Sequence, residues 1–170
     1  GSAAVVTLAD GKENGLIIKD KAAAMLSFDK GSSNQEYPSS LMGAIALLRQ
    51  TYLDADWYKK DKNKKEYNIS LEAFNNLQTL PQIFEANDKL NVLRADKIGD
   101  EFKTNYIIKT NGTDYQRLEE IKATNCKLIV PINFPLPYDV EDVYDARNVS
   151  LTELKHWEMA PVNTYALEKY

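Results

Sequence analysis

Histidine and cysteine are almost absent from this sequence, and both scarcities limit the chemistry open to it. The chain has one cysteine, Cys126, and one histidine, His156. A single cysteine excludes a disulfide within the chain, and a fold held without disulfides leaves the cellular compartment open. A lone histidine argues against a zinc site, because such sites usually draw about three or four N, S or O ligands. Seven glycines and six prolines in 170 residues exclude collagen-like and low-complexity chains.

Long apolar runs and an excess of basic residues are also missing. No stretch comes near the ~20 apolar residues of a membrane-spanning helix, so we predict no membrane partner. The 21 basic and 25 acidic residues give a net charge of −4 without a basic face, which predicts no nucleic-acid partner. The one basic cluster, residues 59–65, is interpreted as a solvated loop. Glycine-rich nucleotide motifs and the G-x-S-x-G nucleophile motif do not occur.

The first 80 residues have an irregular pattern with one clear helix. Segments 3–8 and 16–19 predict short strands, and 22–28 is ambiguous between helix and strand. Apolar residues then recur at steps of 4, 3, 4 and 3, which predicts a helix up to about residue 60 with Ser39 as its cap. A second, shorter helix is predicted to open at Ser70. The residues on the first helix's apolar face are Leu41, Ile45, Leu48, Tyr52 and Ala55.

From residue 81 onward the pattern becomes regular. Apolar strands at 82–86, 106–109 and 127–132 alternate with two helices, and the marker residues Ile83, Tyr106 and Leu128 lie 23 and 22 residues apart. Continuous apolar strands at this pitch are typical of parallel βαβ units that are covered on both faces. We therefore predict an α/β fold and one domain over 1–170. The pattern is compatible with an open doubly wound sheet and with an arc of a (β/α)8 barrel.

Two helix starts carry a capping-box pattern, and a last helical region closes the sequence. In this pattern a hydroxyl accepts from the backbone N–H three residues later, and the side chain of that later residue accepts from the N–H of the first. The two pairs with this spacing are Thr113 with Gln116 and Ser150 with Glu153. The second box begins a region that is helical to the end of the chain. It contains His156, which we expect to lie away from the strand ends.

Polar residues follow the predicted strands and form the candidate site. Parallel strands carry their sites at their carboxyl ends, which here are occupied by Glu85, Asn87, Lys109 and Asn111. A carboxylate, an ammonium and two amides around one rim would suit a small polar ligand or an anion. The alternative is that the asparagines are helix caps and turn formers and that Lys109 is solvated. Glu85 is expected to pair with Lys109 when the site is empty.

Several stretches resemble the imidazolonepropionase-like branch of the amidohydrolase superfamily. They are 43–58 (GAIALLRQTYLDADWY), 81–135, which includes 93–102 (LRADKIGDEF), 138–142 (YDVED) and 154–161 (LKHWEMAP). The similarity is greatest to large bacterial proteins with two amidohydrolase-like regions. It implies a metal-dependent (β/α)8 barrel that hydrolyses C–N bonds of amides or cyclic amides. The three regular strands would then be about the fifth to the seventh of eight.

The resemblance also shows where this chain departs from the family. There a histidine ends the fifth strand and another ends the sixth, and both bind the divalent metal, such as zinc, that activates water. The corresponding segments here, 83–88 and 107–112, contain no histidine. Glu85 or Asn87 could replace a ligand in principle, but Lys109 would place a positive charge beside the metal. The resemblance therefore implies a degenerate segment with no cofactor of its own and no catalytic residue.

Three functional hypotheses remain open at this point. The chain is a structural, non-catalytic piece of an amidohydrolase-like parent, a binding module with a ligand at the rim, or an active hydrolase with an altered site. We expect its partners to be the remainder of the parent chain and further copies of itself, because cutting a barrel exposes strand edges. The source would be bacterial, and the compartment could be the cytoplasm or outside it.

Overall fold

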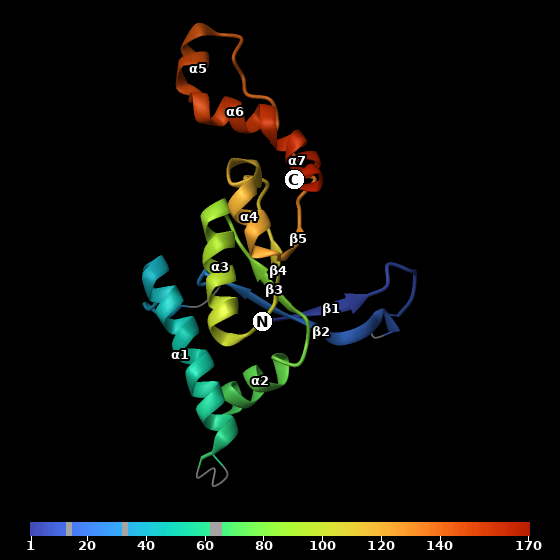
Figure 1. The fold of residues 1–170 in the computed structure, drawn as a ribbon. Helices are drawn as coiled ribbons and strands as arrows, with labels where there is room; N and C mark the ends of the chain where they lie inside the picture. The colour runs from blue at the N-terminus through green and yellow to red at the C-terminus, as the bar shows by residue number, and fades with distance from the viewer. Residues whose placement is uncertain (13–14, 32–33, 62–65) are drawn as a thin grey trace. The chain divides into compact units, whose positions relative to one another are not determined.

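The computed structural model describes residues 1–12, 15–31, 34–61 and 66–170 (Figure 1). Helices and strands alternate along most of the chain. In order they are β1 (Ser2–Val6), β2 (Ile17–Ser27), α1 (Leu41–Lys60), α2 (Ile69–Leu77), β3 (Gln82–Glu85), α3 (Lys89–Phe102), β4 (Tyr106–Lys109), the 3-10 turn η2 (Asp114–Gln116), α4 (Leu118–Thr124), β5 (Lys127–Ile129), α5 (Val143–Asn148), α6 (Leu151–Met159), the 3-10 turn η3 (Ala160–Val162) and α7 (Asn163–Lys169). Within these ranges no helix is long and apolar enough to cross a membrane.

The five strands form one sheet in the order β1-β2-β3-β4-β5. The pair β1 and β2 is antiparallel with an irregular register, in which Ser2 faces Ala24 and Val6 faces Ile17. The pair β2 and β3 is parallel, and Ser27 faces Glu85. The strands β3, β4 and β5 are separated by α3 and α4, as βαβ units require. The predicted fold class is confirmed: an α/β fold with parallel βαβ units, consistent with part of a (β/α)8 barrel.

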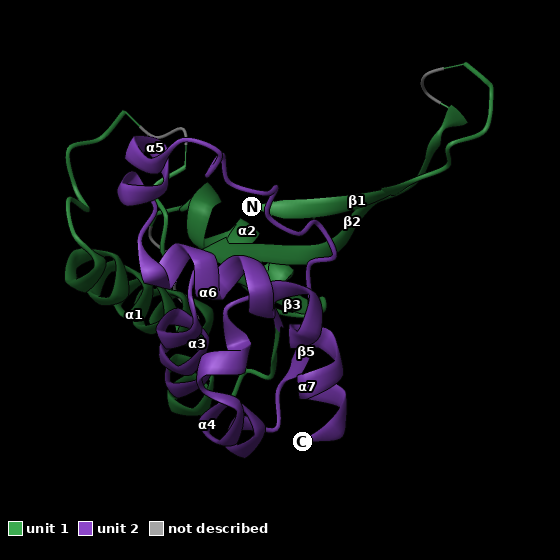
Figure 2. Ribbon diagram, turned by 90° about the horizontal axis from the view of Figure 1, so that it is seen from above, with its two compact units in different colours: residues 1–85, 98–107 green, residues 86–97, 108–170 purple. Residues whose placement is uncertain are grey.

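The chain divides into two compact units (Figure 2). Unit 1 consists of 1–85 and 98–107, and so holds β1 to β3, α1, α2, the last five residues of α3 and the first two of β4. Unit 2 consists of 86–97 and 108–170, and holds the first nine residues of α3, the last two of β4 and the elements from η2 to the end of the chain. The organisation of 1–170 as a single domain stays a prediction.

Aromatic rings build the core of unit 1. The ring of Tyr52 in α1 stacks on the ring of Phe102, with the ring centroids 4.6 Å apart. Tyr52 and Phe74 pack edge to face, with their centroids 5.0 Å apart. Phe84 of β3 contacts Phe28 at 4.7 Å and Tyr106 at 5.2 Å. These contacts explain the predicted face of α1, because Tyr52 and Ala55, one helical turn apart, are both buried.

Some predicted boundaries differ from the structure for local reasons. The cap of α1 is Ser40 rather than Ser39, and its Oγ accepts a hydrogen bond from Gly43 N at 3.2 Å. The helix predicted from Ser70 begins at Ile69, because the Asn68 side chain caps it. The segment 16–19 and the ambiguous 22–28 belong to one strand, β2, which ends at Ser27.

Two further boundaries concern the later part of the chain. The strand β5 ends at Ile129, shortly before Pro131, which has no backbone N–H for a sheet. Lys59 and Lys60 end α1, whereas 62–65 of the predicted basic loop lie outside the described residues.

Of the two predicted capping boxes, one is present. Ser150 Oγ accepts from Glu153 N, and the Glu153 carboxylate accepts from Ser150 N at 2.8 Å. At Thr113 the prediction is wrong, because its side chain makes no capping bond to η2. Its hydroxyl instead donates to Asn111 Oδ1 at 2.6 Å and accepts from Lys89 N at 3.2 Å.

Candidate ligand-binding site at the strand ends

Backbone hydrogen bonds in unit 2 bring the segments at the ends of successive strands together. Ala86 N, just after β3, donates to the carbonyl of Lys109 at 2.9 Å. Thr110 N, just after β4, donates to the carbonyl of Ile129 at 3.0 Å. The carboxyl ends of parallel strands are where α/β proteins place ligands, so the geometric requirement for a rim site is met here.

The two predicted asparagines are in contact, and their side chains serve the local backbone. Asn111 Nδ2 donates to the backbone carbonyl of Asn87. Asn111 Oδ1 accepts from Thr113 N at 3.2 Å and from the Thr113 hydroxyl, which shapes the turn around Gly112 at φ +88°. Asn87 Oδ1 accepts from Asn91 Nδ2, in the first turn of α3. Both asparagines therefore act as the turn formers that the alternative interpretation described.

Asp88, the next polar residue after Asn87, also bonds the local backbone, and it caps the start of α3. Asp88 Oδ1 accepts from Leu90 N at 2.6 Å and from Asn91 N at 2.9 Å. A carboxylate that caps a helix start is stabilised by the orphan N–H groups and by the helix dipole. Asp88 Oδ1 is therefore occupied by hydrogen bonds to the first turn of α3.

The two charged rim residues end neighbouring strands of the sheet. Glu85 is the last residue of β3 and belongs to unit 1, whereas Lys109 is the last residue of β4 and belongs to unit 2. Both side chains are exposed. Lys109 lies two residues before Asn111 in the chain. Within unit 2 the structure therefore assembles Asn87, Lys109 and Asn111 at one group of loops.

A buried polar cluster beneath this loop was not predicted from the sequence. Asp114 is 0% and Asn163 is 1% exposed. Asn163 Nδ2 donates to Asp114 Oδ2 at 3.1 Å, and Asn163 Oδ1 accepts from Tyr115 N at 2.7 Å. Two buried oxygens, Asp114 Oδ1 and Thr110 Oγ1, have no hydrogen-bond partner among the described residues. No local pattern signals this cluster, because 49 residues separate Asp114 from Asn163.

The single histidine and the single cysteine also find partners in unit 2. His156 Nδ1 lies 3.5 Å from the Tyr115 hydroxyl, and the two rings are nearly parallel with centroids 6.1 Å apart. His156 of α6 thus contacts η2, and its separation from the strand ends stays a prediction. Cys126 is half-buried, and its thiol donates to Asp96 Oδ1 at 3.1 Å.

The residues at these strand ends do not fit a divalent metal. A metal would need several carboxylate or imidazole ligands, but Lys109 brings a positive charge and the asparagine side chains already bind the backbone. In 1–12, 15–31, 34–61 and 66–170 no three His, Cys, Asp or Glu residues are grouped so that they could hold an ion.

Comparison with known proteins yields one informative likeness. No protein-family model and no curated protein matches the chain. The crystal structure of an amidohydrolase from Thermotoga maritima matches with a TM-score of 0.63 at 16% sequence identity. The match covers 95% of this chain and 45% of that one, so the chain spans less than half the length of this neighbour. At such low identity the likeness establishes an amidohydrolase-like fold and nothing finer.

Proposed function

We propose that this chain is a segment of an amidohydrolase-like barrel and that its role in the parent protein is structural rather than catalytic. The observation that carries the proposal is that the polar side chains at the strand ends bond nearby parts of this same chain. Asn87, Asp88 and Asn111 each bind the backbone or the first turn of a neighbouring helix, so the rim stabilises its own loops. The parent would hydrolyse C–N bonds of amides or cyclic amides at a metal site formed by other residues.

Two further observations support this proposal. The likeness to the Thermotoga maritima amidohydrolase extends over nearly all of this chain but less than half of that protein, as expected for a segment. The ends of β3 and β4 are Glu85 and Lys109, in place of the histidines that the family resemblance implies. The imidazolonepropionase-like branch and a parent with two amidohydrolase-like regions belong to the same proposal and rest on the sequence stretches alone.

Metal analysis and hydrolysis assays on the purified chain test the structural role. We expect no stoichiometric zinc or manganese after dialysis against metal-containing buffer, and no turnover of amide, cyclic-imide or dipeptide substrates. An amidohydrolase with intact histidine ligands, treated identically, is the positive control. Bound metal together with turnover that a chelator abolishes would refute the role, and loss of that turnover in Lys109→Met would assign it to this rim.

The second candidate function is a binding module without catalysis. The observation that favours it is that exposed Lys109 lies two residues before Asn111, whose side chain binds the Asn87 carbonyl. An ammonium next to ordered amides suits a carboxylate or a phosphate. Titration with small carboxylates and with inorganic phosphate, followed by NMR, tests it. Saturable shifts of the 109–113 amides that disappear in Lys109→Met would favour this function over the structural one.

A further inference from the structure

Asp114 in unit 2 is a carboxylate that the fold removes from water without supplying a positive partner. Its side chain is fully buried, and its Oδ2 accepts a hydrogen bond from Asn163 Nδ2 at 3.1 Å. Among the residues that the structure describes, Asp114 forms no ion pair, and its Oδ1 has no hydrogen-bond partner. A buried carboxylate is costly unless a positive charge lies beside it. The surroundings of Asp114 therefore require a positive charge that the described side chains do not provide.

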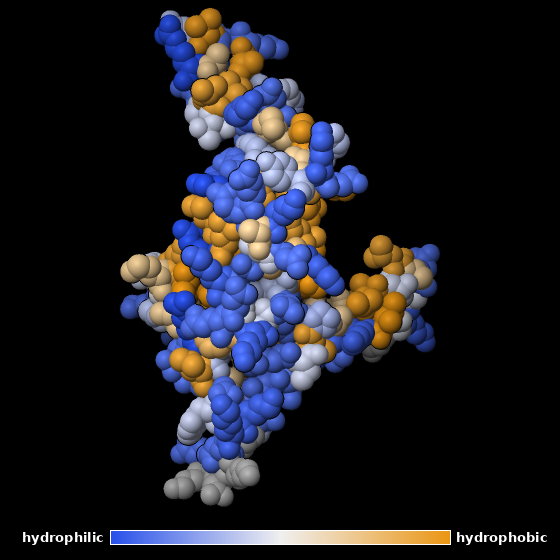
Figure 3. Space-filling view, viewed as in Figure 1, coloured by the Kyte–Doolittle hydropathy of each residue, from blue (hydrophilic) through white to orange (hydrophobic). Residues whose placement is uncertain are grey.

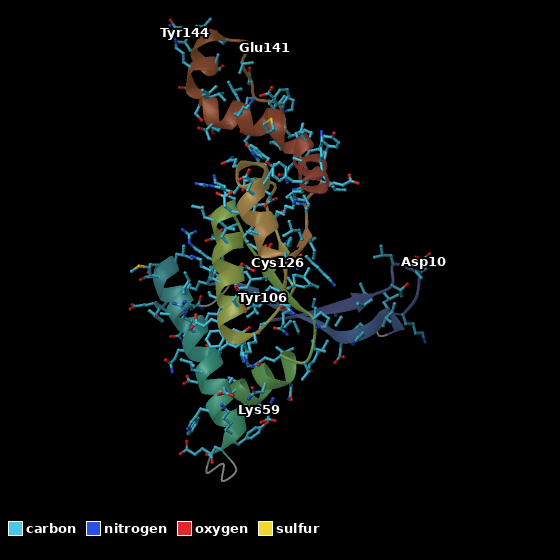
Figure 4. All side chains as sticks on the ribbon, in the orientation of Figure 1. Asp10, Lys59, Tyr106, Cys126, Glu141 and Tyr144 are labelled. Atoms are coloured by element: carbon cyan, nitrogen blue, oxygen red, sulfur yellow. The ribbon has the colours of Figure 1, made fainter. Side chains whose placement is uncertain are left out.

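Other acidic residues of unit 2 are stabilised in the ordinary ways. Figure 3 shows hydrophilic side chains over much of the visible surface, where water solvates a charge. Glu141, labelled in Figure 4, is exposed on the loop before α5. Glu120 and Glu158 form ion pairs with nearby basic residues at 2.7 Å. Asp114 differs from these three residues because it has neither water nor a basic side chain beside it.

A second buried oxygen without a partner belongs to the same turn. Thr110 is 4% exposed, and its Oγ1 has no hydrogen-bond partner among the described residues. It lies four residues before Asp114, and the backbone between them turns at Gly112 with φ +88°. Both ends of the turn are anchored, because Thr110 N donates to the Ile129 carbonyl and Tyr115 N donates to Asn163 Oδ1. One anchored turn thus carries two unsatisfied oxygens, a hydroxyl and a carboxylate, and hard metal cations bind such oxygens.

We propose that Asp114 Oδ1 and Thr110 Oγ1 bind a monovalent metal cation, Na⁺ or K⁺. One positive charge balances the one carboxylate, so the buried site becomes neutral overall. A water molecule would satisfy the hydrogen bonds but leave the carboxylate charge uncompensated. A divalent ion would leave an excess positive charge, and such ions usually draw more than one carboxylate. The ion strengthens the attachment of the turn to α7, because Asn163 of α7 already binds the other oxygen of Asp114. This inference goes beyond the proposed function and does not depend on it.

Thermal unfolding of the full chain in three chloride salts at one ionic strength tests the ion site. The salts are those of K⁺, Na⁺ and N-methylglucamine, an organic cation too large for a buried site. A ligand that binds only the folded chain raises its melting temperature. We expect K⁺ or Na⁺ to raise it by at least about 2 °C over the organic cation, with saturation as the metal concentration rises. Equal melting temperatures in the three salts, or stabilisation by Mg²⁺ or Ca²⁺ alone, would overturn the proposal.

Four variants locate the ion, and each is compared with itself between salts so that a lower intrinsic stability does not matter. Asp114→Asn removes the charge and Thr110→Val removes the hydroxyl, so both should abolish the difference between metal and organic cation. Thr110→Ser keeps the hydroxyl and should retain the difference. Asp142→Asn is the matched control, because Asp142 is an exposed cap of α5 and asparagine caps equally well.

Circular dichroism shows which variants are folded. If Asp114→Asn does not fold, the comparison of Thr110→Val with Thr110→Ser still decides the assignment. A metal-specific shift that persists in Asp114→Asn or in Thr110→Val, or that disappears in Asp142→Asn, would overturn it. The structural role would survive those results, because zinc or manganese content and turnover test it separately.

Discussion

The buried pair of hydroxyls on Tyr52 and Tyr106 gives a sharp test of the packing in unit 1. Their oxygens are 2.7 Å apart, and the residues are only 4% and 3% exposed. The Tyr52 hydroxyl also bonds the side chain of Thr104, whereas the Tyr106 hydroxyl has Tyr52 as its partner. The two hydroxyls are therefore not equivalent, although the pair looks symmetric.

We predict that Tyr52→Phe destabilises the chain more than Tyr106→Phe does. The first change leaves the Tyr106 hydroxyl buried without a partner, which costs about 1–3 kcal/mol. The second leaves Tyr52 bonded to Thr104, so only about 0.5–1.5 kcal/mol is lost. Phenylalanine keeps the ring contacts with Phe102 and Phe74, so the comparison isolates the hydroxyls. The double variant should lose less than the sum of the single losses, by about 1 kcal/mol.

Urea unfolding followed by circular dichroism measures all four stabilities in one double-mutant cycle. Equal losses in the two single variants would contradict the assignment of Thr104 as a second partner. Strictly additive losses would show that the hydroxyls do not interact in solution. A change in the urea dependence itself would indicate a changed unfolded state rather than a lost hydrogen bond.

The same pair predicts how stability depends on alkaline pH. Burial raises the pKa of Tyr106 and of Tyr52 above the ordinary value of 10.0. The unfolded state then releases its tyrosine protons first, so the stability from these groups is complete below pH 10 and falls as pH rises above it. Thermal unfolding across this range should show a shallower alkaline loss in the double phenylalanine variant. Equal slopes in the two proteins would refute the reasoning.

Two further predictions concern close packing and the buried polar cluster. Gly99→Ala would place a Cβ 2.6 Å from the carbonyl oxygen of Thr104, so we expect a loss of about 1–3 kcal/mol in urea unfolding. Gly15→Ala, with no atom within 4 Å of its Cβ, is the control, and an equal loss there would contradict the packing argument. Asn163→Leu should cost about 3 kcal/mol, because it removes the partner of Asp114 Oδ2 and of Tyr115 N. Thr164→Ala, on the exposed side of α7, should be nearly neutral, and a similarly small loss in Asn163→Leu would mean that the cluster is solvated.

The sequence by itself determines the elements whose patterns repeat over several turns or strands. The helix α1 ends at Lys60 as its apolar spacing indicates, and the bounds of β4 are those predicted. The αβ alternation after residue 81 also follows from the sequence, because a buried parallel strand needs a continuous apolar run. These features depend on residues that are close together in the sequence, so the spacing of apolar residues is sufficient to predict them.

The tertiary structure decides which of several local options each polar residue takes. Thr113 has the spacing of a cap, yet its hydroxyl bonds Asn111 and Lys89 because the loop after β4 lies against the start of α3. Ser150, with the same spacing, caps its helix. Asp114 and Asn163 become buried partners across 49 residues, a separation that local patterns do not span. A polar side chain can bond several alternative partners, and hydrogen bonds act only at short range. The partner that it bonds therefore depends on which backbone segments the fold brings close to it.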